Sequence, residues 1–212
     1  MKTAAVVCLL VLYAVSGDAH EWSVARFKSS KVTKAEGKRE VRTSYGTCWL
    51  ADLKDAGLKG KGLIVTAAHT LEGHERFFFE WSYRWVEAKV VFADVERDVA
   101  VLKSVARLKG TMPFKLAKDR ILTFHASGYG QGVTSYTALP DKVVLDKKIE
   151  PGNSGSPVVG KDKRVVGMII AARGVGKKKL GKGVFAHASV IRAAITAHLK
   201  KETKKKETES GS

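Results

Sequence analysis

The fold is constrained most strongly by a series of short β-rich runs between Phe27 and Val190, bounded by glycine pairs or clusters of Asp and Lys. The clearest runs are Leu63–Thr66, Glu87–Phe92, Val99–Leu102, Lys142–Leu145, Pro157–Val159 and Val165–Ile170. Short strands at this spacing favour an all-β sandwich or barrels over alternating strands and helices. One helix is expected near the end of the chain, where a single apolar stripe is formed by Val190, Ile191, Ala194, Ile195, His198 and Leu199.

The length of 212 residues and the hydrophobic content of 44% suit one large all-β domain or two smaller ones that share an interface. A break between Thr111 and Asp119 predicts an N-terminal half at 20–115 and a C-terminal half at 116–200. The tail at 201–212 is rich in Lys, Glu, Thr and Ser, so we expect it to be disordered.

The first 19 residues have the three parts of a secretory signal peptide. A short basic start precedes an apolar run from Ala4 to Val15, and small residues allow cleavage after Gly17 or Ala19. An uncleaved anchor is the alternative, but this apolar run is short for a bilayer span. The sequence therefore predicts a secreted protein, extracellular or periplasmic, without stable membrane insertion.

Only Cys48 remains once the cysteine inside the signal peptide is removed, so no internal disulfide is expected. Cys48 lies in an apolar run, which predicts a buried and inert thiol. The formal net charge of +17 predicts attraction to polyanions. Solvated charge is the simpler interpretation, because many of these cations lie in a presumed loop tip at 177–179 and in the tail.

Three segments carry groups suited to nucleophilic catalysis: Ile64–Thr70 ends in a histidine, Arg97–Leu102 begins with an acid, and Pro151–Pro157 holds a serine between glycines. A serine hydroxyl needs an imidazole to accept its proton, and the imidazole needs an acceptor that orients it. His69, Asp98 and Ser154 supply that set. The glycines allow a turn in which the N–H groups of Gly152 and Ser154 form an oxyanion hole. No metal or organic cofactor is implied.

Other residues compete for two of these roles. Asp94 is the alternative acid, although no tight apolar run follows it as one follows Asp98. Ser156 is the alternative nucleophile, but it lacks the glycine two positions before and the glycine one position after that flank Ser154. The remaining histidines are expected to be structural: His74, His125, His187 and His198.

The three motifs, in this order, resemble those of the trypsin-like (chymotrypsin-fold) serine peptidases. Val65–His69 and Arg97–Leu102 are similar to the histidine and aspartate motifs. Gly152–Pro157 resembles the serine motif in the Asn-containing form of bacterial glutamyl-endopeptidase-like and HtrA-like members. Gly183–Ala186 with the helix after it resembles the family's last strand and closing helix. The residues after Leu199 are too few for a PDZ domain, so we expect none.

The resemblance implies two six-stranded antiparallel β-barrels packed face to face, with a C-terminal α-helix. It implies a serine endopeptidase that cleaves polypeptides through an acyl-enzyme on Ser154, and we expect a monomer. The alternative is a catalytically silent protein on the same fold that binds polyanions or surfaces through its positive charge.

The resemblance also suggests a specificity pocket with Lys148, six residues before the nucleophile, at its base. Its walls would be Ile169, Ile170 and Phe185, with Ala171 beside them. A cation at the base favours Glu or Asp in the substrate, whereas a solvent-facing Lys148 leaves a pocket for small apolar residues.

Two departures from the family pattern affect folding and activation. Thr70 stands where many members have the disulfide partner of Cys48, so the histidine loop is expected to be held by packing alone. Asn153 replaces the aspartate that receives a new N-terminal amine in zymogen-type members. We therefore expect an enzyme that is competent once it is folded and secreted.

Overall fold

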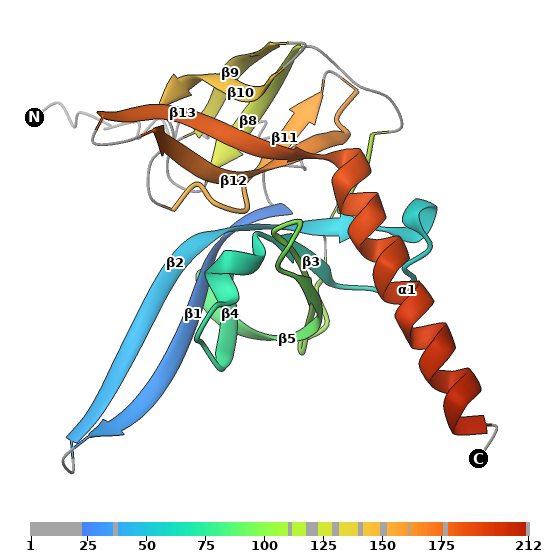
Figure 1. Ribbon diagram of the computed structural model, residues 1–212. Helices are drawn as coiled ribbons and strands as arrows, with labels where there is room; N and C mark the ends of the chain where they lie inside the picture. Colours follow the sequence, from blue (N-terminus) through green and yellow to red (C-terminus); the bar gives the residue numbers. More distant parts are fainter. Residues whose placement is uncertain are drawn as a thin grey trace, which may run out of the picture.

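The computed structural model describes residues 23–35, 38–109, 112–117, 123–128, 132–139, 142–148, 152–160, 162–175 and 178–210. The predicted signal peptide lies outside these residues. The described part is mostly β-structure, with a closed barrel and a C-terminal helix (Figure 1).

Seven strands form the N-terminal sheet in the order β1-β4-β5-β6-β3-β2-β7, and β1 also pairs with β2. Their bounds are β1 (Val24–Ala35), β2 (Lys38–Asp52), β3 (Leu63–Thr66), β4 (Arg76–Trp81), β5 (Arg84–Asp94), β6 (Val99–Ser104) and β7 (Phe114–Lys115). The predicted six antiparallel strands are present as β1 to β6, and β7 is a seventh, short strand that pairs parallel to β2. The connection to the second half thus adds a short strand to the sheet.

The C-terminal strands close into a six-stranded barrel in the order β10-β13-β12-β11-β8-β9. Their bounds are β8 (Thr123–Gly128), β9 (Gly132–Leu139), β10 (Lys142–Lys148), β11 (Pro157–Gly160), β12 (Val165–Val175) and β13 (Lys178–His187). All six pairings around the ring are antiparallel. The predicted barrel of this half is therefore confirmed.

One hydrophobic cluster joins the two halves to the helix α1 (Ala188–Ser210). Trp49 from the N-terminal sheet, Met168 from the C-terminal barrel and Ile191 from α1 are all fully buried in it. The predicted apolar stripe of the helix is the face that packs here, since Ala194 and Ile195 are also buried. Burying such side chains is worth about 1.5–3 kcal/mol each, which fixes the two halves against one another.

The predicted disordered tail is replaced by helix as far as Ser210. Residues 201–210 are exposed, so packing does not hold this part of α1. Lys and Glu are good helix formers, and Lys205 and Glu209 approach to 3.9 Å across one turn. Compositional polarity alone led to the expectation of disorder, and the helical propensity of the same residues explains the difference.

The hairpin of β1 and β2 extends beyond the rest of the N-terminal sheet (Figure 1). The two strands pair in unbroken register from Val24 opposite Trp49 to Ala35 opposite Lys38. The base of the hairpin is buried, whereas residues 40–45 of β2 are exposed. The sequence runs had not indicated these two long strands, because their outer part is rich in Lys and Arg.

Candidate active site

His69 follows a fully buried strand and is presented at the surface. β3 supplies four buried residues, and the chain then enters η3 (Ala68–Leu71), a short 3-10 turn. Ala68 and Thr70 on either side of the histidine are buried, while the His69 side chain is 43% exposed. The apolar strand and its buried flanking residues thus fix the backbone of a histidine whose imidazole is open to solvent.

Asp98 stands immediately before β6 and holds His69 through both carboxylate oxygens. Its Oδ1 accepts the His69 backbone N–H at 2.8 Å, and its Oδ2 lies 2.7 Å from His69 Nδ1. Asp98 has a φ of 53°, in the left-handed region that Asp adopts more readily than most residues. The two contacts fix the ring orientation and leave Nε2 as the nitrogen that faces away from Asp98.

The carboxylate also changes the titration of the imidazole. The hydrogen bond from His69 to Asp98 raises the pKa of His69, partial burial opposes the shift, and the negative charges of Asp98 and Glu72 add to it. The net pKa of His69 is above its ordinary value of 6.5. The ring therefore keeps its proton to higher pH than a free histidine.

Asp94, the competing acid, is engaged elsewhere. Its carboxylate accepts hydrogen bonds from the Arg97 backbone N–H at 3.0 Å and from the Arg97 guanidinium at 2.8 Å. Burial raises the pKa of Asp94, but these bonds outweigh it and the net pKa is lowered. No contact joins Asp94 to His69, so Asp98 is the acid that the structure brings to the histidine.

Ser154 lies in a tight loop before β11 that depends on two glycines. Gly152 and Gly155 have φ values of 96° and 90°, which L-residues with side chains adopt at a cost. The Ser156 N–H closes the turn on Asn153 O at 2.9 Å. Ser154 is partly exposed, whereas Ser156 is fully buried and so shielded from any substrate.

Thr47 on β2 ties this serine loop to the N-terminal sheet. Its N–H donates to Ser154 O at 2.8 Å, and its hydroxyl donates to Gly152 O at 2.7 Å. A Cβ on Gly155 would collide with Thr47 O and Thr66 Oγ1. The sequence analysis missed Thr47, since no spacing pattern distinguishes one strand threonine from another.

Gly46 shows how the histidine and serine segments converge. A Cβ at this position would lie 3.1 Å from Ser154 O and 3.1 Å from Thr70 Cγ2. The loop that carries Ser154 and the residue after His69 therefore both lie against Gly46. The structure brings Asp98 into hydrogen-bonding contact with His69 and the backbone of Ser154 near the residue that follows His69. No hydrogen bond joins the Ser154 hydroxyl to His69 among the described residues.

The histidine segment is held by hydrogen bonds as well as by packing, which corrects the expectation of packing alone. The Thr70 hydroxyl donates to Ala67 O at 2.6 Å, and Ser29 Oγ donates to Thr70 O at 2.6 Å. These buried bonds take the place of the bridge that Cys48 and a partner cysteine would form. Cys48 is 1% exposed and unpaired, and its burial raises the pKa of the thiol, so the predicted burial of this cysteine is confirmed.

The residues expected around the specificity pocket are only partly described. The side chain of Lys148 lies outside the described part. Ile169 and Phe185 are cross-strand neighbours, both buried, and Ile169 binds the serine loop through Gly155 N–H at 2.7 Å and Ser156 O at 2.9 Å. Ile170 instead packs against the cluster that joins both halves to α1.

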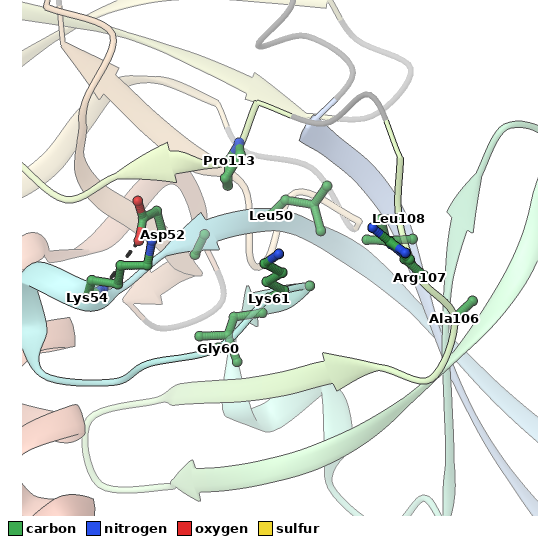
Figure 2. A pocket seen from close by; sticks show the side chains of 12 residues that line it. Leu50, Asp52, Lys54, Gly60, Lys61, Ala106, Arg107, Leu108 and Pro113 are labelled. Carbon is green, nitrogen blue, oxygen red and sulfur yellow. Dashed lines mark hydrogen bonds between the residues drawn. The ribbon is translucent and has the colours of Figure 1, made fainter.

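A separate pocket of about 410 Å³ (Figure 2) is lined by Leu63 at the start of β3, whereas His69 follows the end of that strand. Lys54, Lys61 and Arg107 reach it from three segments, over an apolar floor that includes Leu50 and Leu63. It contains none of the residues predicted for catalysis or specificity. Within the described ranges, no group of three or more His, Cys, Asp and Glu is arranged to hold a metal.

The other histidines whose side chains are described make local contacts. His74 Nδ1 lies 2.7 Å from Glu72 O, and His198 stacks on Phe92 with ring centroids 4.7 Å apart. His187 lies against Phe185 at the same centroid distance. The side chain of His125 lies outside the described residues.

Comparisons with known proteins agree with this arrangement. The family model of a trypsin-like peptidase domain matches residues 46–168. A probable periplasmic serine endoprotease, DegP-like, from Halomonas elongata is 30% identical over 152 residues, which cover 63% of this chain and 31% of that relative. The aligned part thus spans about a third of the relative's length.

Solved structures share the fold at lower identity. The Rv3671c protease from M. tuberculosis in its active form has a TM-score of 0.62 at 20% identity, covering 85% of this chain and 82% of that one. The HtrA-type protease AlgW with a decapeptide has a TM-score of 0.61 at 18% identity, covering 84% of this chain and 64% of that one.

No described helix is long and apolar enough to cross a bilayer.

Proposed function

Because this chain belongs to the family of trypsin-like peptidase domains, we propose that it is a serine endopeptidase with His69, Asp98 and Ser154 as its triad. Ser154 Oγ attacks the substrate carbonyl while His69 Nε2 takes its proton. Asp98 holds the tautomer and stabilises the imidazolium that forms. His69 then protonates the leaving amine, and water releases the acyl group from Ser154 by the reverse steps.

The observation that carries this proposal is the paired contact of Asp98 with the His69 backbone and ring, at 2.8 and 2.7 Å. The oxyanion hole is assigned to the N–H groups of Gly152 and Ser154. Neither group donates to any described residue, and Thr47 fixes the adjoining carbonyls, so both donors remain available for a developing oxyanion.

The finer parts of the proposal extend beyond the family. We propose residues 1–19 as a signal peptide and export as the consequence; the Halomonas elongata relative is named periplasmic. The N-terminal sheet at 20–115 would be the first barrel of a double-barrel enzyme, with the second at 116–200. Asn153 would make activation independent of a new N-terminus, and the enzyme would act as a monomer on polypeptides, with Lys148, Ile169, Ile170 and Phe185 shaping its pocket.

Covalent labelling by a fluorophosphonate probe tests the proposal. The wild-type protein should be labelled, Ser154→Ala should not, and Ser156→Ala should still be labelled because that hydroxyl is fully buried. If the folded wild-type protein is not labelled and binds heparin in a salt-sensitive way, the silent polyanion-binding alternative replaces the peptidase. The comparisons give no support for that alternative.

A further inference from the structure

The outer part of the β1–β2 hairpin pairs with no other described strand of the N-terminal sheet. β4 pairs with β1 only from Phe27 to Ser30, and β3 pairs with β2 only from Trp49 to Ala51. Beyond these contacts the hairpin is a two-stranded ribbon, which we call the basic arm: residues 31–35 of β1 and 38–45 of β2 (Figure 1). Two strands alone are marginally stable in water.

The arm concentrates positive charge in a way that weakens it further. Between Lys28 and Arg42 the sequence has six Lys or Arg and two Glu, a net charge of +4. The register sets Lys31 opposite Arg42 and Lys34 opposite Arg39. Like charges directly across a strand pair are destabilising. Lys31 has Glu75 at 3.9 Å, but Arg42 makes no ion pair with any described residue. An anionic partner would relieve this repulsion.

One edge of the arm leads directly to the serine loop. The Thr47 N–H and carbonyl bind Ser154 O and Thr66 Oγ1, so both point away from β1. In an antiparallel ladder of unbroken register, every second residue directs its backbone groups to the same edge. The arm residues that share the edge of Thr47 are Val41, Thr43 and Tyr45. No described strand pairs with this edge along the arm.

A cation also lies across the strand pair from Tyr45, on β1. Lys28 is the cross-strand partner of Tyr45, and its Nζ lies 4.8 Å from the ring centre of Trp85 and 5.4 Å from that of Phe78. Contact with two rings restrains the Lys28 chain without neutralising its charge. The Tyr45 side chain is 55% exposed and lies 6.5 Å from Trp85 between ring centroids.

We propose that the basic arm captures acidic segments of polypeptide substrates, which add as an extended strand to the outer edge of β2. Backbone groups of Val41, Thr43 and Tyr45 would pair with the segment, and the cations of both strands would select Asp and Glu side chains. A polypeptide suits this surface better than other polyanions, because only a peptide backbone matches an open strand edge. That the captured segment is a substrate rests on the proposed peptidase function.

Binding of synthetic peptides to the Ser154→Ala protein tests the capture without requiring catalysis. The probes are a Glu/Val-alternating decapeptide and its Gln/Val counterpart, compared by calorimetry at low and physiological salt. We expect the Glu peptide to bind about tenfold more tightly at low salt, and the advantage to shrink as salt rises. Equal binding of the two peptides, or no binding, would overturn the proposal.

Backbone N-methylation of the Glu peptide separates strand addition from charge attraction alone. Methyl groups on one alternate set of residues should abolish binding, and methyl groups on the other set should leave it, because only one set faces the β2 edge. If both methylated peptides fail to bind, or if both still bind, strand addition is rejected. On the protein, Thr43→Pro should weaken binding about fivefold by removing one edge N–H while keeping the fold.

Matched charge variants locate the binding surface. Lys31→Gln with Arg42→Gln should lower the preference for the Glu peptide about threefold to tenfold. Lys204→Gln with Lys205→Gln removes the same charge from the exposed end of α1 and should leave the preference intact. If both double variants lose the preference for the Glu peptide equally, the attraction is nonspecific. If heparin or single-stranded DNA binds more tightly than the Glu peptide and its binding depends on the arm, the partner is a different polyanion. If the arm variants cleave substrates as the wild type does, the peptidase proposal is retained and only the proposal for the arm is rejected.

Discussion

The two halves of β2 form one strand in one register, yet one half is buried and the other is exposed to solvent. From Gly46 to Ala51 every residue of β2 is buried, and this half contacts the serine loop, β3 and the shared core. From residue 40 to Tyr45 every residue is exposed, and β1 is the one described strand that pairs with this part of β2. Strand pairing alone therefore extends much farther than packing does.

The difference between the two halves shows which part of β2 needs to be rigid. The inner half fixes backbone groups that must hold a reactive loop within fractions of an ångström. The outer half keeps its hydrogen-bonding edge open, and its cations discourage nonspecific pairing with other edges. A single strand thus combines a packed scaffold with an exposed surface, and perturbations at its two ends should have very different effects.

The largest effect is expected at the catalytic pair beside the inner half. Asp98→Asn should lower kcat about 10⁴-fold, because the imidazole loses the acceptor that fixes its tautomer. In the wild type, activity should rise with pH as His69 loses its proton, with a midpoint above 6.5. Asp98→Asn should move that midpoint to lower pH, since the main cause of the raised pKa of His69 is removed.

Rate–pH profiles on a peptide substrate measure both quantities. Asp94→Asn serves as the control, because Asp94 binds Arg97 and not His69. If the midpoint of the rate–pH profile is unchanged in Asp98→Asn, the carboxylate is not the main cause of the raised pKa of His69. If kcat falls equally in Asp98→Asn and Asp94→Asn, Asp98 is not the specific partner of His69.

A smaller effect is expected where the inner half meets the serine loop. Gly155→Ala should lower the free energy of unfolding by about 3–5 kcal/mol, because the new Cβ collides with Thr47 O in addition to the backbone strain at φ 90°. Gly73→Ala has similar strain at φ 69° but no atom within 4 Å, so about 1–2 kcal/mol is expected. Urea unfolding compares them, and equal losses would show that the collision is relieved by movement.

The smallest effect is expected on the arm. Val41→Ala, at a side chain that is 56% exposed, should change the free energy of unfolding by less than about 0.5 kcal/mol. Val65→Ala, at a fully buried position on β3, should cost about 2 kcal/mol. Thermal and urea unfolding of the two variants test this contrast. A large loss for Val41→Ala would mean that the arm is packed in solution.

Sequence motifs predicted the contact between His69 and Asp98, but they did not predict the bonds that hold the surrounding segments. The order of His69, Asp98 and Ser154 with their apolar or glycine neighbours was enough to single them out. The supporting bonds from Thr47 to Gly152 and from Ser29 to Thr70 were not predictable, because they join residues far apart in the chain. A threonine in a strand has the same local pattern whether or not its hydroxyl finds a carbonyl.

Two of the elements that the sequence analysis missed are polar. Apolar alternation indicated the buried strands, but the outer part of β1 and β2 is strand because pairing continues from a buried base. The outer part of α1 is helix because Lys and Glu favour it after a packed start at Ile191 and Ile195. Both cases show regular structure propagating from a core into residues whose composition resembles that of a disordered segment.

The bond between Thr47 and Gly152 also orders events during synthesis. The two residues are 105 positions apart, so β2 is made long before the loop that it holds. Until the ribosome has added Gly152, the Thr47 hydroxyl has no such carbonyl to bind. The bond that holds the loop of the proposed nucleophile can therefore form only after most of the chain has been made.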